Sequence, residues 1–181
     1  MANYAAFLRG VNLGPHRRVS SVQLRSMFED MGFQDVGTFR SSGNVVFGGA
    51  RGPVGTLTAR VETAMAEALG WEVEVFLRTA DEIRAIAAHQ PFDPRHVQAS
   101  KGKLQVSLLS ATPPPDVQRQ VLALATDEDR LAFGECELYW LPSGGLLESE
   151  LDLKTIDKLL GSSTRRTKGT MEQLYEKFFA G

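Results

Sequence analysis

The chain has 181 residues, of which 43% are hydrophobic and 23% are charged, and its net charge is −2. This composition is ordinary for a soluble globular protein of one compact domain or two small ones, and the charge gives no general attraction to nucleic acid. No apolar run approaches the roughly 18 residues of a membrane-spanning helix, and no signal peptide is recognisable. We therefore expect a cytoplasmic protein without a membrane partner, which the single cysteine, Cys136, also fits.

The first part of the chain alternates between strand and helix patterns. In order, we expect a strand at 4–8, a helix at 20–32, strands at 36–39 and 44–47, a helix at 57–70 and a strand at 72–78. Ser20 and Gln23 have the spacing of a capping box, and Gly70 marks a helix end. The last strand alternates and is expected to be half-buried. This β-α-β-β-α-β order is the ferredoxin-like pattern, which predicts an antiparallel sheet with both helices on one face.

The second part repeats the order of elements without repeating the sequence. We expect a helix at 79–89, a loop or linker at 90–102, a strand at 104–108, a helix at 112–125, strands at 131–133 and 136–141, a helix at 153–161, a polar edge strand at 162–168 and a last helix capped from Thr170. The predicted fold is therefore α+β: two ferredoxin-like (α/β-plait) units, with mainly antiparallel sheets and helices packed on one face. The predicted domains are 1–95 and 96–181.

A basic, glycine-containing loop follows the first predicted strand. Glycine backbones that adopt positive φ can expose successive N–H groups to an anion, and arginine adds fixed positive charge. We expect this loop to bind a small ligand that bears a phosphate or a carboxylate. The residues of this predicted anion site are Arg9, Gly10, Asn12, Gly14, Arg17 and Arg18.

Two further segments could contribute to the same site. The turn between the second and third strands supplies hydroxyl and amide groups from Ser42, Gly43 and Asn44. The basic C-terminal stretch supplies Thr164, Arg166 and Thr170, if the two predicted domains face one another. The competing interpretation is local: glycines serve turns, Asn side chains satisfy nearby backbone, and arginines are solvated or paired with acidic residues.

Charge is distributed unevenly along the chain. Residues 1–52 carry six Arg and three Asp or Glu, whereas residues 113–160 carry four Lys or Arg and ten Asp or Glu; residues 161–181 return to four against two. Both ends are basic and the stretch at 113–160 is acidic. Solvated helix faces would give the same distribution.

Several chemistries have little support in the sequence. Neither a phosphate-binding GxxxxGK[ST] loop nor GxGxxG occurs, and the three histidines lack metal-ligand spacing, so we expect no metal and no cofactor. The acid pairs Asp127/Asp129 and Glu148/Glu150 are weak candidates for general acid and base. Cys136 is expected to be an inert, buried thiol.

Single-stranded RNA binding by the sheet is a further alternative. Ferredoxin-like sheets bind RNA through exposed aromatics within a characteristic motif. Val45-Val46-Phe47 is too poor in aromatics to match that motif, and the chain lacks a basic excess. We therefore expect no nucleic-acid partner.

Two stretches carry a family resemblance. Leu8–Gly14 resembles LRGINVGG and Ser42–Phe47 resembles QSGNVVF, which are characteristic of the DUF1697 family of bacterial proteins. The resemblance implies a pair of ferredoxin-like units, and it implies no activity, because the family is named for having no established function.

The C-terminal resemblance departs from the family at several positions. The family stretch is similar to TxRNWNTVxKL, and Thr164, Arg166 and Thr170 match it; Lys168 stands where Trp is usual and Gly169 where Asn is usual. Ser149-Glu150-Leu151 lacks the lysine of a Ser-Lys-Leu segment. Three function classes therefore remain open: anion binding, an enzyme that acts on such a ligand, and a protein-interaction or RNA-binding module.

Overall fold

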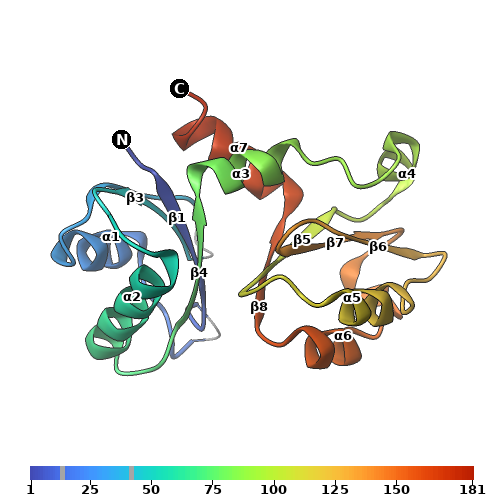
Figure 1. Cartoon of the computed structure of the whole chain (residues 1–181), viewed down its shortest axis with the longest axis horizontal. Coiled ribbons are helices and arrows are strands. Elements are labelled where there is room, and N and C mark those ends of the chain that lie inside the picture. The colour runs from blue at the N-terminus through green and yellow to red at the C-terminus, as the bar shows by residue number, and fades with distance from the viewer. Residues whose placement is uncertain (13–14, 41–42) are drawn as a thin grey trace. The chain divides into compact units, whose positions relative to one another are not determined.

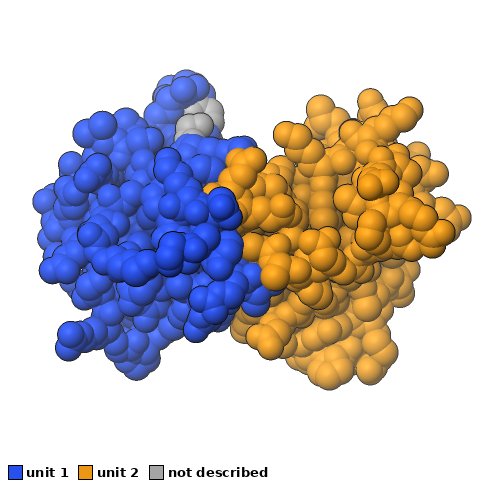
Figure 2. Space-filling view, turned by 90° about the horizontal axis from the view of Figure 1, so that it is seen from above, with its two compact units in different colours: residues 1–85, 174–181 blue, residues 86–173 orange. Residues whose placement is uncertain are grey.

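The computed structural model describes residues 1–12, 15–40 and 43–181. Gly14 and Ser42 of the predicted anion site lie outside these residues. By its contacts the chain divides into two compact units: unit 1 is Met1–Ala85 with Leu174–Gly181, and unit 2 is Ile86–Gln173 (Figure 2). Each unit is described below by itself, and the domain ranges 1–95 and 96–181 stay a prediction.

Unit 1 has the predicted order of strands and helices (Figure 1). Its elements are β1 (Tyr4–Arg9), α1 (Ser21–Asp30), β2 (Gln34–Thr38), β3 (Asn44–Gly48), α2 (Val54–Leu69), β4 (Glu74–Thr79) and the first part of α3 (Ala80–Ala88), together with the end of α7 (Lys168–Phe178). The four strands form an antiparallel sheet in the order β2-β3-β1-β4. This is the ferredoxin-like arrangement that the sequence predicts.

The helices of unit 1 begin and end where the capping residues predict. At α1, Ser20 Oγ accepts the Gln23 N–H and the Gln23 side chain accepts the Ser20 N–H, which completes the capping box. Thr79 and Glu82 form the same reciprocal pair at α3. Gly70 closes α2 in the left-handed conformation, at φ 83°.

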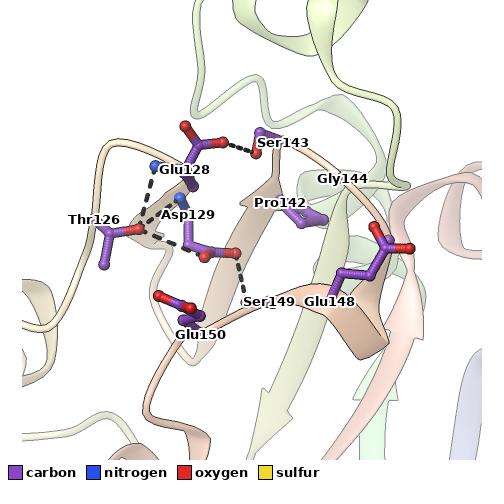
Figure 3. A pocket seen from close by; sticks show the side chains of 10 residues that line it. Thr126, Glu128, Asp129, Pro142, Ser143, Gly144, Glu148, Ser149 and Glu150 are labelled. Carbon is purple, nitrogen blue, oxygen red and sulfur yellow. Dashed lines mark hydrogen bonds between the residues drawn. The ribbon is translucent and has the colours of Figure 1, made fainter.

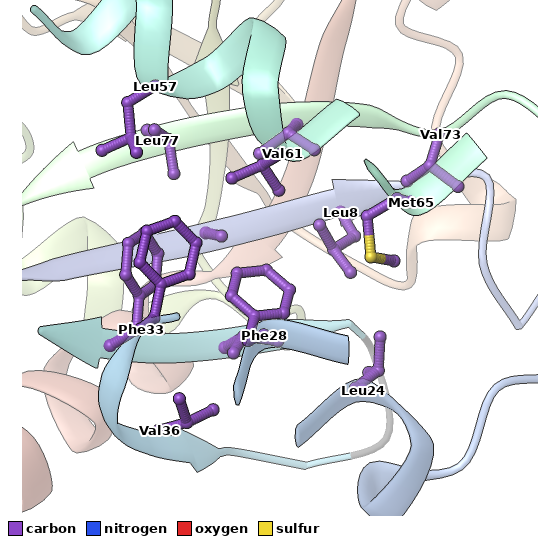
Figure 4. Close-up of a cluster of buried hydrophobic side chains, with 14 of the residues drawn as sticks. Leu8, Leu24, Phe28, Phe33, Val36, Leu57, Val61, Met65, Val73 and Leu77 are labelled. Carbon is purple, nitrogen blue, oxygen red and sulfur yellow. The ribbon is translucent and has the colours of Figure 1, made fainter. Parts of the chain in front are cut away.

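The core of unit 1 lies between the sheet and the helices α1 and α2 (Figure 4). Its centre is a group of aromatic rings around Phe47, whose side chain is fully buried. The Phe47 ring centroid lies 4.5 Å from that of Phe33 and 5.3 Å from that of Phe28. Aliphatic side chains of α2, such as Val61 and Met65, complete this core on the same face.

The second face of this sheet is also buried, which the sequence does not predict. Phe76 and Arg78 of β4 point away from the α1–α2 side and are only 3% and 6% exposed. The expectation of a half-buried β4 was therefore wrong for the second half of that strand. The end of α7 packs on this face, because Phe178 lies against Gly37 and makes an edge-on ring contact with Phe39 at 6.3 Å.

Unit 2 repeats the same topology with different side chains. Its elements are the end of α3, α4 (Pro94–Ala99), β5 (Gln105–Leu109), α5 (Pro115–Leu122), β6 (Asp129–Phe133), β7 (Glu137–Pro142), the short 3₁₀ helix η1 (Leu146–Glu148), α6 (Leu153–Leu160), β8 (Ser163–Thr167) and the start of α7. The sheet is antiparallel in the order β6-β7-β5-β8. The polar segment β8 is an edge strand, as predicted.

Two local expectations for unit 2 were wrong. The predicted linker 90–102 contains α4, which begins after Asp93, whose side chain accepts the Arg95 N–H. The last helix begins at Lys168 and not at Thr170, because Thr167 is the capping residue and its hydroxyl accepts the Thr170 N–H at 3.1 Å.

The helices α5 and α6 cover one face of the second sheet. Trp140, Leu138 and Ile156 are buried in the cluster between them. Among the helices of the described ranges, none is long and apolar enough to cross a membrane. Two four-stranded antiparallel sheets, each with helices on the expected face, therefore confirm the predicted fold class.

Replacement of Phe47 tests the aromatic core of unit 1. We expect Phe47→Ala to lower the free energy of unfolding by about 3–5 kcal/mol, because the cavity left among Phe28, Phe33 and the helices cannot fully collapse. Urea unfolding followed by circular dichroism measures this loss. Val22→Ala, at a position 75% exposed, is the control and should change stability by less than about 0.5 kcal/mol. A Phe47→Ala loss as small as that of the control would contradict the assigned core.

Candidate functional site

The structure brings the loop after β1 and the turn before β3 together. The Leu8 N–H donates to the Gly43 carbonyl at 2.9 Å. A Cβ built on Gly43 would lie 2.8 Å from Cγ2 of Val11, so the turn packs directly against the loop. The two segments that carry the strongest sequence motifs are therefore neighbours in unit 1.

Asn12 holds the basic loop closed. Its backbone has φ 58°, and its N–H donates to the Arg17 carbonyl at 2.6 Å. Its side-chain oxygen accepts the Val19 N–H at 3.0 Å. The side-chain oxygen of Asn12 therefore satisfies nearby backbone, as the competing interpretation expects, and links residue 12 to residue 19. Gly10, with φ 100°, makes the sharp exit from β1.

Asn44 has a similar role in the turn. It is buried, and its side-chain amide donates to the Phe39 carbonyl at 2.9 Å. The Phe39 N–H donates in turn to the Asn44 carbonyl at 3.0 Å. These bonds join the ends of β2 and β3 and hold the backbone beside Gly43 in place.

The cationic side chains of this region reach solvent. Arg9, Arg17 and Arg18 are exposed, and so is Arg40, which precedes the turn. Sequence reasoning missed Arg40, although it lies next to the predicted turn and has φ 60°, which is uncommon outside glycine. Four exposed arginines thus lie in the loop or beside the turn.

Trp71 is a second residue that sequence reasoning missed. Its Nε1–H donates to the Gly10 carbonyl at 2.8 Å, and the guanidinium of Arg17 lies 5.9 Å from its ring centroid. Trp71 therefore supports the basic loop from the start of the segment that leads to β4. A sequence separation of 61 residues leaves no local pattern that could reveal this contact.

The C-terminal residues of the predicted site belong to unit 2. Arg166 Nη1 donates to Thr164 Oγ1 and to the Arg165 carbonyl, both at 2.8 Å. Burial lowers the pKa of Arg166 to about 10, because desolvation penalises the charged guanidinium. Successive side chains of a strand point to opposite faces, so Thr164 and Arg166 share one face of β8. Arg165 points to the other face, where its guanidinium lies over the Trp140 ring.

Two residues near Arg166 serve the start of α7. Thr170 shares a hydroxyl hydrogen bond of 2.8 Å with Thr167. Lys168, which stands at the position of the family tryptophan, is buried; its Nζ donates to the Ala87 carbonyl at 2.8 Å and to Glu172 at 3.1 Å. Lys168 thus anchors α7 to the end of α3.

An acidic cavity of about 480 Å³ lies at the end of the β6–β7 hairpin of unit 2 (Figure 3). It gathers Asp129, Glu148 and Glu150 from the two acid pairs that the sequence singled out, and adds Glu128. In the part of the chain that the structure describes, no three Asp, Glu, His or Cys side chains are placed to hold one metal ion. Cys136 is only half-buried, and its Sγ lies 3.3 Å from the Leu109 carbonyl oxygen.

Comparisons with known proteins identify a family and support the fold. A family model described as a protein of unknown function (DUF1697) matches residues 1–139, so Thr164, Arg166 and Thr170 lie outside the match. No curated protein matches the chain. Among solved structures, a conserved bacterial protein from Streptococcus pneumoniae is similar over 97% of each chain, with 19% identity and a TM-score of 0.73. At this identity the similarity concerns the fold alone.

The contact between the turn and the loop can be tested at Gly43. Gly32 and Gly43 both have positive φ, 88° and 77°, but a Cβ at Gly32 would meet nothing within 4 Å. We expect Gly32→Ala to lower the free energy of unfolding by about 1 kcal/mol through backbone strain alone. Gly43→Ala should cost roughly 1–3 kcal/mol more, because its Cβ would crowd Val11 and Leu8. Equal losses in urea unfolding would show that the turn does not pack tightly on the loop.

Proposed function

Since the chain belongs to the DUF1697 family, whose description assigns no activity, we propose a function from its own residues: it binds a small anionic ligand, bearing a phosphate or a carboxylate, at the loop 9–18 and the turn 42–44. Arg9, Arg17 and Arg18 supply the charge, and Gly10 and Gly43 let the backbone come close. Asn12 and Asn44 hold these segments in position. Gly14 and Ser42 complete the proposed set.

The observation that carries the proposal is the presence of exposed arginines in the loop after β1 and beside the turn before β3, two segments that are in contact at Leu8, Val11 and Gly43. Residues 1–28 contain no Asp or Glu, so no acidic neighbour along the chain offsets the loop. Glu74 is the register partner of Arg9 across the β1–β4 ladder. Because Arg9 has this acidic partner, Arg17 and Arg18 supply most of the positive charge in the proposed site. A planar guanidinium can bind a phosphate or a carboxylate through paired N–H donors.

Thr164, Arg166 and Thr170 belong to the proposal as a second set of residues, within unit 2, of which Arg166 is the charged one. Arg166 is partly buried, and this burial lowers the pKa of its guanidinium. An anion interacts more strongly with a desolvated cation than with a solvated one. Arg166→Gln tests this group separately from the loop.

RNA binding through the first sheet receives no support from the aromatic residues. Stacking of bases needs ring faces that are open to solvent. Phe7 and Phe76 lie on the sheet face opposite α1 and α2, and they are 0% and 3% exposed. These two rings are buried and offer no open face for stacking.

Phosphate titration tests the proposal directly. We expect inorganic phosphate to raise the midpoint of thermal unfolding above that in NaCl of equal ionic strength, since a ligand at a hundred times its Kd stabilises by about 2.7 kcal/mol. The double variant Arg17→Gln/Arg18→Gln should weaken phosphate binding roughly tenfold or more, because charge-assisted hydrogen bonds are lost. Isothermal titration calorimetry measures the change in Kd.

The matched control removes two exposed arginines elsewhere in unit 1. Arg25 lies on α1 and Arg51 follows the end of β3 that is distant from the turn. Arg25→Gln/Arg51→Gln has the same net charge as the test variant and should bind phosphate like the unaltered protein. An equal loss in both double variants, or no effect of phosphate beyond that of NaCl, would refute the site.

A further inference from the structure

The indole ring of Trp71 lies beside the basic loop and supplies no charge to it. Its Nε1–H donates to the Gly10 carbonyl at 2.8 Å, so the ring is fixed where the chain leaves β1. We propose that the anion bound at the loop is the phosphate of a nucleoside monophosphate, whose base stacks on Trp71. This inference rests on the proposed function and names the class of ligand for the same site.

Part of the indole ring lies outside the core of unit 1. Trp71 is half-buried, and it packs against the hydrophobic cluster between the sheet and its helices. The guanidinium of Arg17, an exposed residue, lies 5.9 Å from the ring centroid, which is close to the outer limit of a cation–π contact. The ring area beside Arg17 is therefore covered by a solvent-exposed side chain and not by the core. A flat group can stack there when the guanidinium turns to an anion.

Arg17 links the phosphate end of such a ligand to its ring. The Arg17 carbonyl accepts the Asn12 N–H at 2.6 Å, so its backbone helps to close the loop, while its side chain reaches Trp71. A phosphate that accepts hydrogen bonds from this guanidinium therefore lies near the indole, with a gap between them. The ribose of a nucleotide spans a gap of this kind between its phosphate and its base.

Acidic residues follow Trp71 and limit the ligand to a single phosphate end. Glu72 and Glu74 are exposed, and a Cβ built on Gly10 would lie 3.2 Å from the Glu72 carbonyl oxygen, so this segment borders the loop. Burial raises the pKa of Glu62, and the charges of Glu74 and Glu72 raise it further. This negative potential disfavours a second phosphate beside the indole, whereas hydroxyl and amino groups can donate to a carboxylate. The charges therefore favour a mononucleotide over a polyanion.

AMP and ribose 5-phosphate are the probes for this inference. The two molecules share the phosphate and the sugar, so the ratio of their Kd values isolates the contribution of the base. In isothermal titration calorimetry on the full chain, the Kd for AMP should be roughly tenfold lower than that for ribose 5-phosphate, because a base stacked on an aromatic side chain tightens binding. Trp71→Leu should bring the two Kd values together.

Trp71→Phe is the matched control, because it separates stacking from support of the loop. Phenylalanine keeps a flat ring but lacks the N–H that donates to Gly10, so both Kd values should rise while AMP remains the tighter ligand. Indole fluorescence gives a second readout. The other tryptophan of the chain, Trp140, is buried, so quenching by AMP should disappear in Trp71→Leu.

The outcomes separate this inference from the proposed function. Equal Kd values for AMP and ribose 5-phosphate in the unaltered protein, or a preference for AMP that survives Trp71→Leu, would overturn the inference. The proposed function would still stand if inorganic phosphate and ribose 5-phosphate bound and Arg17→Gln/Arg18→Gln weakened both. Absence of binding by all three phosphate compounds would refute the inference and the proposed function together.

Discussion

The complete burial of β1 is the constraint on which unit 1 depends. Residues Ala5 to Leu8 are at most 2% exposed, and β1 pairs with β3 on one side and with β4 on the other. Every backbone group of such a strand must find its partner within the sheet, because no water reaches it. The strand can therefore end only where the chain reaches solvent, at Arg9, and Gly10 provides the turn. The position of the basic loop follows from this constraint.

Most of the fold could be predicted because the local rules and the tertiary structure agree. The capping box at Ser20 and the stop at Gly70 act through neighbouring backbone, so their effect is visible in the sequence. The buried second face of β4 could not be predicted, since Phe76 and Arg78 give no alternation that distinguishes a covered face from an open one. The helix α4 was missed because two prolines within 90–102 suggested a loop, although Pro94 occupies the first turn of the helix, where proline is tolerated.

The candidate site was predictable in its charge and less so in the roles of its residues. A sequence cannot tell whether an asparagine amide faces a ligand or its own backbone, and the structure shows the local role for Asn12 Oδ1 and for the amide of Asn44. The support from Trp71 depends on how β4 returns beside β1, which only the packed sheet fixes. The acidic cavity also depends on strand pairing. The β6–β7 hairpin places Asp129 opposite Pro142, and the Asp129 carboxylate accepts a hydrogen bond from the buried Trp140 Nε1.

The two units show how one topology can hold opposite chemistries. Both sheets have the ferredoxin-like strand order, yet the first ends in a basic loop and the second in an acidic cavity. The strand order constrains only the buried side chains, which must fill the space between sheet and helices; the loops beyond the strand ends are free to differ. The net charge of −2 is therefore a poor guide to partners, because it is the small difference between 20 basic and 22 acidic residues that are segregated along the chain. The sign of each local surface is therefore a better physical guide than the net charge to the kind of ligand that each unit could hold.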